Sequence, residues 1–133
     1  MRQLADFEGA WQLTRRVTEA GGRVTEVTGR AVWRRQGAGL VCEETGEMRV
    51  PGHAPMQVVR RMLWGPGLSV AFEDGRPFHD VPTEGGAVSH WCAPDRYDGH
   101  YDFSRWPEFR VEWRVRGPRK DYQMVTDYRR ETP

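Results

Sequence analysis

The strongest constraint on the fold is the alternation of apolar and charged residues over residues 108–116. Five charged residues alternate there with four apolar ones, which are Phe109, Val111, Trp113 and Val115. Side chains of a strand point alternately to opposite faces, so a period of two predicts one buried face and one solvated face. A helix has a period of 3.6 and does not sort these residues onto one side. The segment therefore predicts a half-buried β-strand.

The same period of two recurs along the chain between turns rich in glycine and proline. We predict nine strands, over residues 11–17, 24–35, 40–50, 56–64, 68–72, 87–92, 96–103, 108–116 and 121–130. A bulge or bend is expected at Gly46, inside the third strand. A short helical turn is expected over residues 4–8, because Asp6 and Glu8 suit a helix N-terminus and Gly9 suits its end.

Nine antiparallel strands with short connections predict a closed or folded sheet, since one flat sheet would leave long unpaired edges. Strands of roughly ten residues, about 33 Å long, suit the tilted wall of a barrel better than a sandwich. The chain has 133 residues, the size of one domain. We therefore predict a single all-β domain over residues 1–133, an antiparallel up-and-down β-barrel.

The charge and the apolar runs of the chain limit its partners and its location. The formal net charge is +1 with acids and bases interspersed, which argues against a nucleic-acid partner. No segment approaches the ~20 apolar residues that cross a bilayer, and residues 1–6 lack a signal-peptide run. We expect a cytoplasmic protein with Cys42 and Cys92 as free thiols, no membrane partner, and either a monomer or a homodimer.

The opening of the first strand, Gly9-Ala10-Trp11, resembles that of the calycin superfamily, which includes the lipocalins. In that superfamily the tryptophan of a G-x-W motif closes one end of the barrel beneath an arginine of the last strand. The resemblance implies that Arg129 or Arg130 stacks on Trp11 here, an interaction worth about 0.5 to 2 kcal/mol.

A second resemblance covers almost the whole chain. Residues 4–11, 72–79, 90–97 and 117–122 resemble the small, mainly bacterial proteins of the domain of unknown function 6314. This resemblance implies a lipocalin-like barrel and no established activity.

Acid–base side chains gather in residues 74–103, which hold three of the four histidines. His79 follows a turn that would place an imidazole at the barrel rim. His79 and His90 are therefore candidate catalytic bases, and Asp95 or Asp98 is a candidate orienting carboxylate. The alternative is that His79 only ends a strand. No nucleophile elbow G-x-S-x-G is present, which disfavours acyl hydrolysis by serine.

Aromatic side chains with hydroxyl tips are expected inside the barrel. If the face of Val111 and Trp113 points inward, four tyrosines of neighbouring strands join it: Tyr97, Tyr101, Tyr122 and Tyr128. Such a lining suits a flat or partly apolar ligand with a few acceptors. The alternative is that these rings fill the core.

Arginines interrupt two otherwise apolar strand faces. Arg15 lies on the face of Trp11, and Arg60 or Arg61 interrupts the fourth strand. An inward arginine needs a partner, either an anionic ligand or an internal carboxylate at Glu43 or Glu44. We take Arg15 and Arg61 as ligand-binding candidates.

A metal site is the weakest of the expectations. His90 and Cys92 are two apart and share a face, and His79 and His100 come from neighbouring segments. These side chains suit zinc, copper or iron, but their spacing matches no established motif. We assign no metal site and leave the cofactor unknown, and we keep Cys92 as a ligand-binding candidate. No glycine-rich nucleotide motif occurs.

These observations favour a barrel that binds a small aromatic or anionic metabolite. Two alternatives remain open. One is an enzyme of the same fold, a lyase, isomerase or hydrolase, that uses His79 or His90 as acid and base. The other is a haem or metal-binding barrel with His79, His90 or His100 as ligand.

Overall fold

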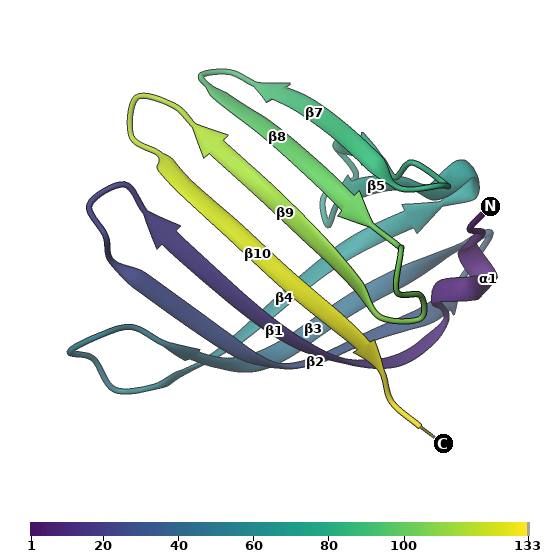
Figure 1. The fold of residues 1–133 in the computed structure, drawn as a ribbon. Helices are drawn as coiled ribbons and strands as arrows, with labels where there is room; N and C mark the ends of the chain where they lie inside the picture. Colours follow the sequence, from purple (N-terminus) through teal and green to yellow (C-terminus); the bar gives the residue numbers. More distant parts are fainter. Residues whose placement is uncertain (133) are drawn as a thin grey trace.

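The computed structural model describes residues 1–132, which form one antiparallel sheet rolled into a barrel, with a short helix at one end (Figure 1). The elements are α1 (Leu4–Phe7), β1 (Gly9–Glu19), β2 (Val24–Gln36), β3 (Gly39–Arg49), β4 (Met56–Gly65), the 3-10 turn η1 (Pro66–Leu68), β5 (Ser69–Phe72), β6 (Pro77–Asp80), β7 (Gly86–Cys92), β8 (Asp95–Asp102), β9 (Phe109–Arg116) and β10 (Asp121–Arg130). The hydrogen-bonded order is β6-β5-β4-β3-β2-β1-β10-β9-β8-β7. The up-and-down barrel predicted from the sequence is confirmed.

The structure has ten strands where nine were predicted. The additional strand is β6, four residues beginning at Pro77, which pairs with β5 across a register shift between Val70 and Ala71. A segment this short, opening with a proline, carries no visible alternation. The bulge expected at Gly46 is wrong: β2 and β3 pair in unbroken register there, with Gly29 opposite Gly46.

The alternation in the sequence matches the two faces of the wall. On β9 the residues Phe109, Val111, Trp113 and Val115 are all buried. The outward residues between them form ion pairs along the surface, as Arg110 does with Asp127 on β10 at 2.8 Å. The inner faces of the ten strands thus converge on one core.

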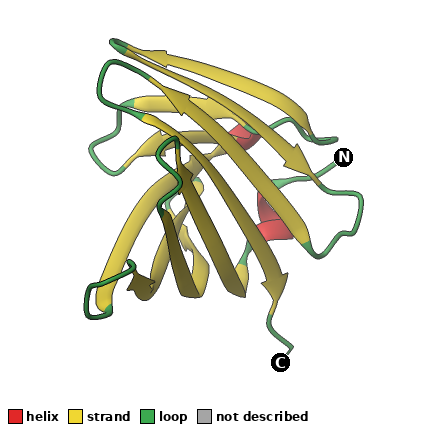
Figure 2. Cartoon of the chain, turned by 60° about the vertical axis from the view of Figure 1, so that its left-hand side comes forward, coloured by secondary structure: helices red, strands yellow, loops and turns green. Residues whose placement is uncertain are grey.

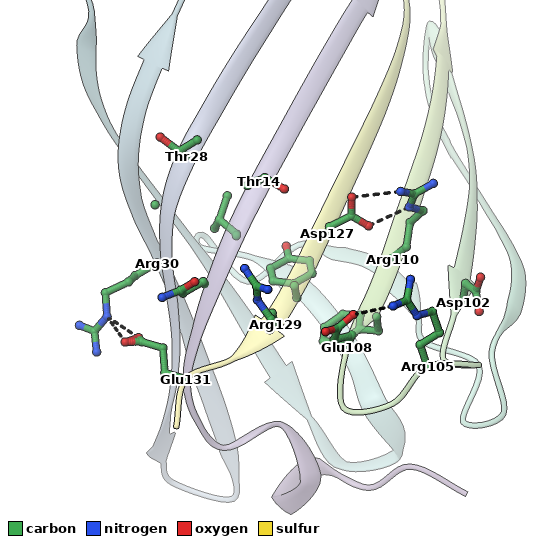
Figure 3. A pocket seen from close by; sticks show the side chains of 15 residues that line it. Thr14, Thr28, Arg30, Asp102, Arg105, Glu108, Arg110, Asp127, Arg129 and Glu131 are labelled. Carbon is green, nitrogen blue, oxygen red and sulfur yellow. Dashed lines mark hydrogen bonds and ion pairs between the residues drawn. The ribbon is translucent and has the colours of Figure 1, made fainter. Parts of the chain in front are cut away.

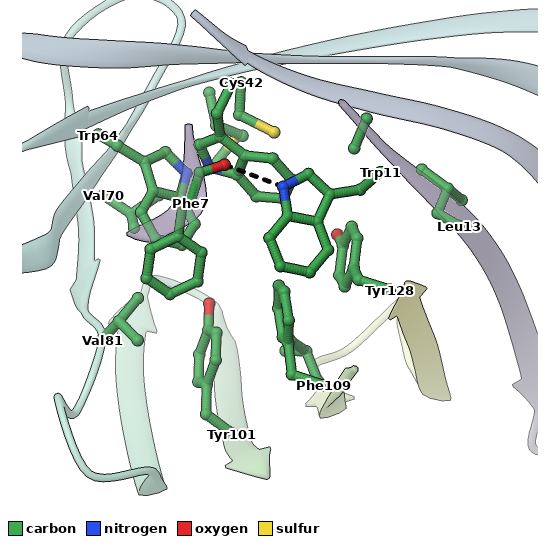
Figure 4. Packing of buried hydrophobic residues seen from close by; sticks show 14 of the residues in the cluster. Phe7, Trp11, Leu13, Cys42, Trp64, Val70, Val81, Tyr101, Phe109 and Tyr128 are labelled. Carbon is green, nitrogen blue, oxygen red and sulfur yellow. Dashed lines mark hydrogen bonds between the residues drawn. The ribbon is translucent and has the colours of Figure 1, made fainter. Parts of the chain in front are cut away.

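Helix α1 and a layer of aromatic rings seal one end of the barrel (Figures 2 and 4). Phe7 of α1 is fully buried and lies 5.0 Å from Trp64 between ring centroids. The Trp11 indole donates a hydrogen bond to the Phe7 carbonyl oxygen at 2.9 Å. The Arg130 guanidinium lies 4.3 Å above the Trp11 ring, and its terminal nitrogens donate to the carbonyl oxygens of Glu8 and Asp6. Arg130 therefore has the position that the calycin resemblance implied.

The opposite end is formed by the turns of the β1–β2, β3–β4, β7–β8 and β9–β10 hairpins (Figure 1). Within residues 1–132 no backbone ladder joins β6 to β7, which are the two ends of the sheet. β5 pairs with β4 only from Met62 to Gly65. The first half of β4 therefore has a strand neighbour on one side only. None of the helices in residues 1–132 is long and apolar enough to cross a membrane.

Candidate functional site

A buried carboxylate, Glu44, holds together a polar cluster inside the barrel. Glu44 is 5% exposed. Its Oε1 lies 2.9 Å from Nη2 of Arg15 and accepts a hydrogen bond from Nε of Arg60 at 3.1 Å. Its Oε2 accepts a hydrogen bond from the Tyr128 hydroxyl at 2.5 Å. Four strands thus contribute one side chain each to the cluster.

The strand register explains how these groups meet. Glu44 and Arg60 are opposite residues on β3 and β4, and Arg15 is opposite Thr126 on β1 and β10. Nε of Arg15 donates to the Thr126 hydroxyl at 2.8 Å. β2 separates the two pairs, and its inward residue opposite Glu44 is Ala31. Because that side chain is small, Arg15 can reach Glu44 across β2.

The electrostatics of the cluster keep Glu44 ionised. Burial alone would raise the pKa of this carboxyl. The guanidiniums of Arg60 and Arg15 and the hydroxyl of Tyr128 outweigh burial and lower the pKa to about 2. Burial raises the pKa of the Tyr128 phenol and of the adjacent Cys42 thiol, and the negative charge of Glu44 adds to both shifts.

His79 is a second polar group of the interior; it is half-buried and comes from β6. Its Nε2 lies 2.7 Å from the hydroxyl oxygen of Tyr101, while Nδ1 is buried and has no hydrogen-bond partner in residues 1–132. Burial, with repulsion from His90 and Arg60, lowers the pKa of His79 to about 4. The imidazole is therefore neutral near pH 7.

A cavity of about 40 Å³ lies among these groups, room for one or two waters at ~30 Å³ each. Glu44, Arg60, His79, Tyr101 and Tyr128 all line it. The other residues that line it are mostly apolar. They are Trp33, Cys42, Met62, Trp64, Val70, Phe78, Phe109, Val111, Trp113, Met124 and Thr126. The Trp33 indole N–H is buried without an acceptor in residues 1–132. The cavity therefore brings together hydrogen-bonding groups that are not all paired.

Several candidates from the sequence lie at or beside this cavity. Tyr101, Trp113 and Tyr128 line it, and Arg15 belongs to the Glu44 cluster. His90 is half-buried and packs against Phe78, with 5.3 Å between ring centroids.

The other tyrosine candidates lie nearer the open end. Tyr97 and Tyr122 are half-buried there, and the Tyr97 hydroxyl accepts a hydrogen bond from Lys120 at 3.1 Å. These two rings are positioned at the rim of the interior.

Arg61 and Asp95 have positions that differ from those expected, and Cys92 lies near the end of its strand. Arg61 is on the outer face of β4, where it binds Glu43 at 2.7 Å, so Arg60 is the inward arginine. Asp95 forms an ion pair with Lys120 at 3.0 Å and contacts no histidine through a hydrogen bond. Cys92 is opposite Asp95, at the turn of the β7–β8 hairpin.

No carboxylate in residues 1–132 hydrogen-bonds to His79 or His90, and Asp98 is bonded to Arg96. No three His, Cys, Asp or Glu residues of the described chain are grouped closely enough to hold a metal ion. Cys42 and Cys92 are both free thiols.

The sequence argument left two choices open, Arg60 or Arg61 and Glu43 or Glu44, and it did not single out Trp33. Counting in twos from the buried residues Met62 and Trp64 places Arg60 on the inner face of β4. The same count on β3, from Leu40 and Cys42, places Glu44 inside. The unpaired Trp33 N–H has no signal in the sequence.

A larger depression, about 820 Å³, lies on the outside of the barrel over β1, β2, β9 and β10 (Figure 3). Most of its charged side chains already pair with one another, as Arg30 does with Glu131 at 2.7 Å and Arg110 with Asp127 at 2.8 Å. Paired, exposed charges of this kind attract a ligand weakly. The interior cavity is therefore the better candidate site.

The barrel, the sealed end and the polar interior define a lipocalin-like protein. A family model described as "Family of unknown function (DUF6314)" matches residues 7–130, and the chain belongs to that family. No curated protein matches the sequence.

Two solved structures resemble the chain in fold. One is the S-type phycobiliprotein lyase CPES from Guillardia theta, with a TM-score of 0.65 and 7% identity, over 98% of this chain and 91% of that one. The other is a de novo designed fluorescence-activating β-barrel, with a TM-score of 0.45 and 14% identity, over 96% of both chains. At 7% identity the first likeness shows the barrel fold alone.

Proposed function

We propose that this protein binds a small molecule inside its barrel, with a polar head in the cavity and an apolar body toward the open end. One observation carries the proposal: the Trp33 indole N–H and the His79 Nδ1 are buried beside the cavity, and neither has a hydrogen-bond partner among the described residues 1–132. Buried polar groups in folded proteins are nearly always paired, and an unpaired one calls for a water or a ligand. A bound head group would supply what these two atoms lack.

The apolar body of the ligand would lie on partly buried residues between the cavity and the open end. Met48, Val58 and Tyr122 pack against the core but retain exposure, and so does Met124, which also lines the cavity. Adaptable methionines and an aromatic ring suit a flat or aliphatic group. The cavity of about 40 Å³ is far below the ~300–1,000 Å³ of drug-sized sites, so only a small head fits inside it.

The acid–base enzyme considered from the sequence would have to use His79 with Tyr101, because Asp95 is engaged with Lys120. The structural likeness to a phycobiliprotein lyase supports a barrel able to enclose a ligand. It does not extend to that protein's reaction. We also propose that the protein is cytoplasmic, as the sequence led us to expect. The binding argument does not depend on this location.

The test is equilibrium dialysis of the purified protein against benzoate, cinnamate and 2-naphthoate and against their neutral amides. At least one of these six probes is expected to bind, and Val111→Phe should weaken its binding at least tenfold, because the added ring fills the cavity that Val111 lines. Val59→Phe is the control, since Val59 is 58% exposed on the outer face of β4.

Two results would contradict the proposal. In the first, none of the six probes binds the wild-type protein. In the second, Val111→Phe and Val59→Phe bind a probe equally well, which would place the probe outside the cavity. Circular dichroism of both variants separates a filled cavity from a lost fold.

A further inference from the structure

We infer that the ligand carries one negative charge, on a carboxylate or a comparable oxyanion, and that Arg60 selects it. This inference rests on the proposed function. It adds the charge of the ligand and the residue that binds the charged group.

The charges inside the barrel do not balance. Two guanidiniums, Arg15 and Arg60, face one carboxylate, Glu44, which leaves one positive charge. Burial keeps the other titratable groups that face them uncharged, because it lowers the pKa of His79 and raises those of Cys42 and the buried tyrosines. A monoanionic ligand would neutralise the site.

Most of the unpaired donors belong to Arg60. Two of the three nitrogens of the Arg15 guanidinium are engaged: its Nε binds Thr126 at 2.8 Å, and its Nη2 lies 2.9 Å from Glu44 and donates to Tyr128 at 3.3 Å. Within residues 1–132 Arg60 hydrogen-bonds through Nε alone, to Glu44. Its two terminal nitrogens are therefore free to donate. A guanidinium in this state binds a carboxylate through two parallel hydrogen bonds.

Arg60 is also accessible to a ligand that enters from solvent. Met62 and Trp64 follow it on the same face of β4 and are 8% and 7% exposed, because β5 pairs with that part of the strand. Arg60 precedes the first residue paired with β5, and its side chain is 43% exposed although its Nε reaches the buried Glu44. The Arg60 side chain is therefore exposed to solvent and lines the cavity at the same time.

The second unpaired donor favours the same chemistry. The Trp33 indole can only donate a hydrogen bond, and Trp33 is 2% exposed beside the cavity. A ligand that satisfies both Trp33 and Arg60 must present acceptor atoms. The oxygens of an oxyanion are such acceptors, whereas an ammonium group would be repelled by the excess positive charge.

The test compares cinnamate with cinnamamide, which share a ring and a side chain and differ in charge. Binding is measured by isothermal titration at pH 7. Wild-type protein is expected to bind cinnamate at least tenfold more tightly than cinnamamide. Arg60→Gln should remove this preference by weakening cinnamate alone. Arg61→Gln is the matched control, because Arg61 is the adjacent arginine on the outer face, and it should leave both affinities unchanged.

Arg60→Lys provides a second variant if Arg60→Gln folds poorly. It keeps the charge and loses the planar fork, so it should retain part of the preference for cinnamate. Equal binding of cinnamate and cinnamamide by the wild-type protein would overturn the inference and leave the proposed function standing. Binding of neither, nor of any other probe in the series, would count against both. An unchanged preference in Arg60→Gln would show that another residue reads the charge.

Discussion

His79 is a half-buried residue of the cavity whose pKa differs between the unfolded and the folded chain in the mildly acidic range. Its pKa falls from 6.5 to about 4 on folding. Between these two values the unfolded chain binds a proton that the folded chain does not, so stability decreases as the pH falls. The neutral His79 makes its full contribution to the free energy of unfolding above pH 6.5. Between pH 7 and pH 5 the free energy of unfolding should fall by roughly 2 kcal/mol as this contribution is lost.

Urea unfolding at pH 7 and at pH 5 measures this loss. His79→Gln keeps a side-chain partner for Tyr101 and cannot ionise, so the variant should lose less stability than the wild type between the two pH values. His53→Gln, in the exposed turn after β3, is the control and should behave as the wild type. Glu44 contributes little to this difference between pH 7 and pH 5. The pKa of its carboxyl is 4.5 in the unfolded chain and about 2 in the folded chain, so it stays mostly ionised over this range. Parallel pH dependence in wild type and His79→Gln would disprove the assignment.

At the residue scale the sequence predicted which strand faces point inward but not which polar groups meet. Period two places Tyr101, Trp113 and Tyr128 inside, and these residues line the cavity. Counting in twos along β4 places Arg60 inside, but the pairing of Arg60 with Glu44 depends on the register of β4 against β3. A contact between strands distant in sequence depends on that register, and a single strand does not contain it.

At the scale of strands, β2 and β3 approach closely where two glycines face each other. Gly29 and Gly46 are opposite residues. A Cβ on Gly29 would overlap the carbonyl oxygen of Thr45, and a Cβ on Gly46 would lie 2.6 Å from that of Thr28. Both obstacles are backbone atoms, so neither can rotate away. The glycines allow the close approach that the sequence analysis interpreted as a bulge.

Gly29→Ala or Gly46→Ala should therefore destabilise the barrel by about 1 to 3 kcal/mol, because the strands must separate locally. Gly21→Ala is the control, since a Cβ there meets nothing within 4 Å. Thermal and urea unfolding of the three variants measure the difference. A loss in Gly21→Ala as large as in Gly29→Ala would show that the effect comes from glycine propensity and not from the contact.

The long strands were predictable because each has enough residues to display its alternation. The strand predicted over 68–72 is shorter in the structure, where Leu68 ends the turn η1 and β5 begins at Ser69. β6 was not predicted, because its four residues have no period of their own and its pairing comes from β5. β6 also carries Phe78 and His79, which complete the cavity. The element that the sequence did not reveal is thus one that the site requires.

At the scale of the whole molecule, the two ends of the barrel differ in construction. The end covered by α1 is closed by packed aromatic rings (Figure 4). The Arg130 guanidinium covers the Trp11 ring there. The opposite end has partly exposed residues such as Met48 and Met124. Rigid packing at one end and exposure at the other allow a ligand to enter without loss of the core.

The sheet should accordingly be least stable along its open seam. β6 and β7 are each hydrogen-bonded to one neighbouring strand, whereas β1, β2 and β10 lie between two strands in the middle of the sheet. Local opening is easier where fewer ladder bonds must break. In hydrogen exchange measured by mass spectrometry, peptides covering β6 and β7 should exchange faster than peptides covering β1, β2 and β10. Exchange in β6 as slow as in β1 would indicate that the seam is closed in solution.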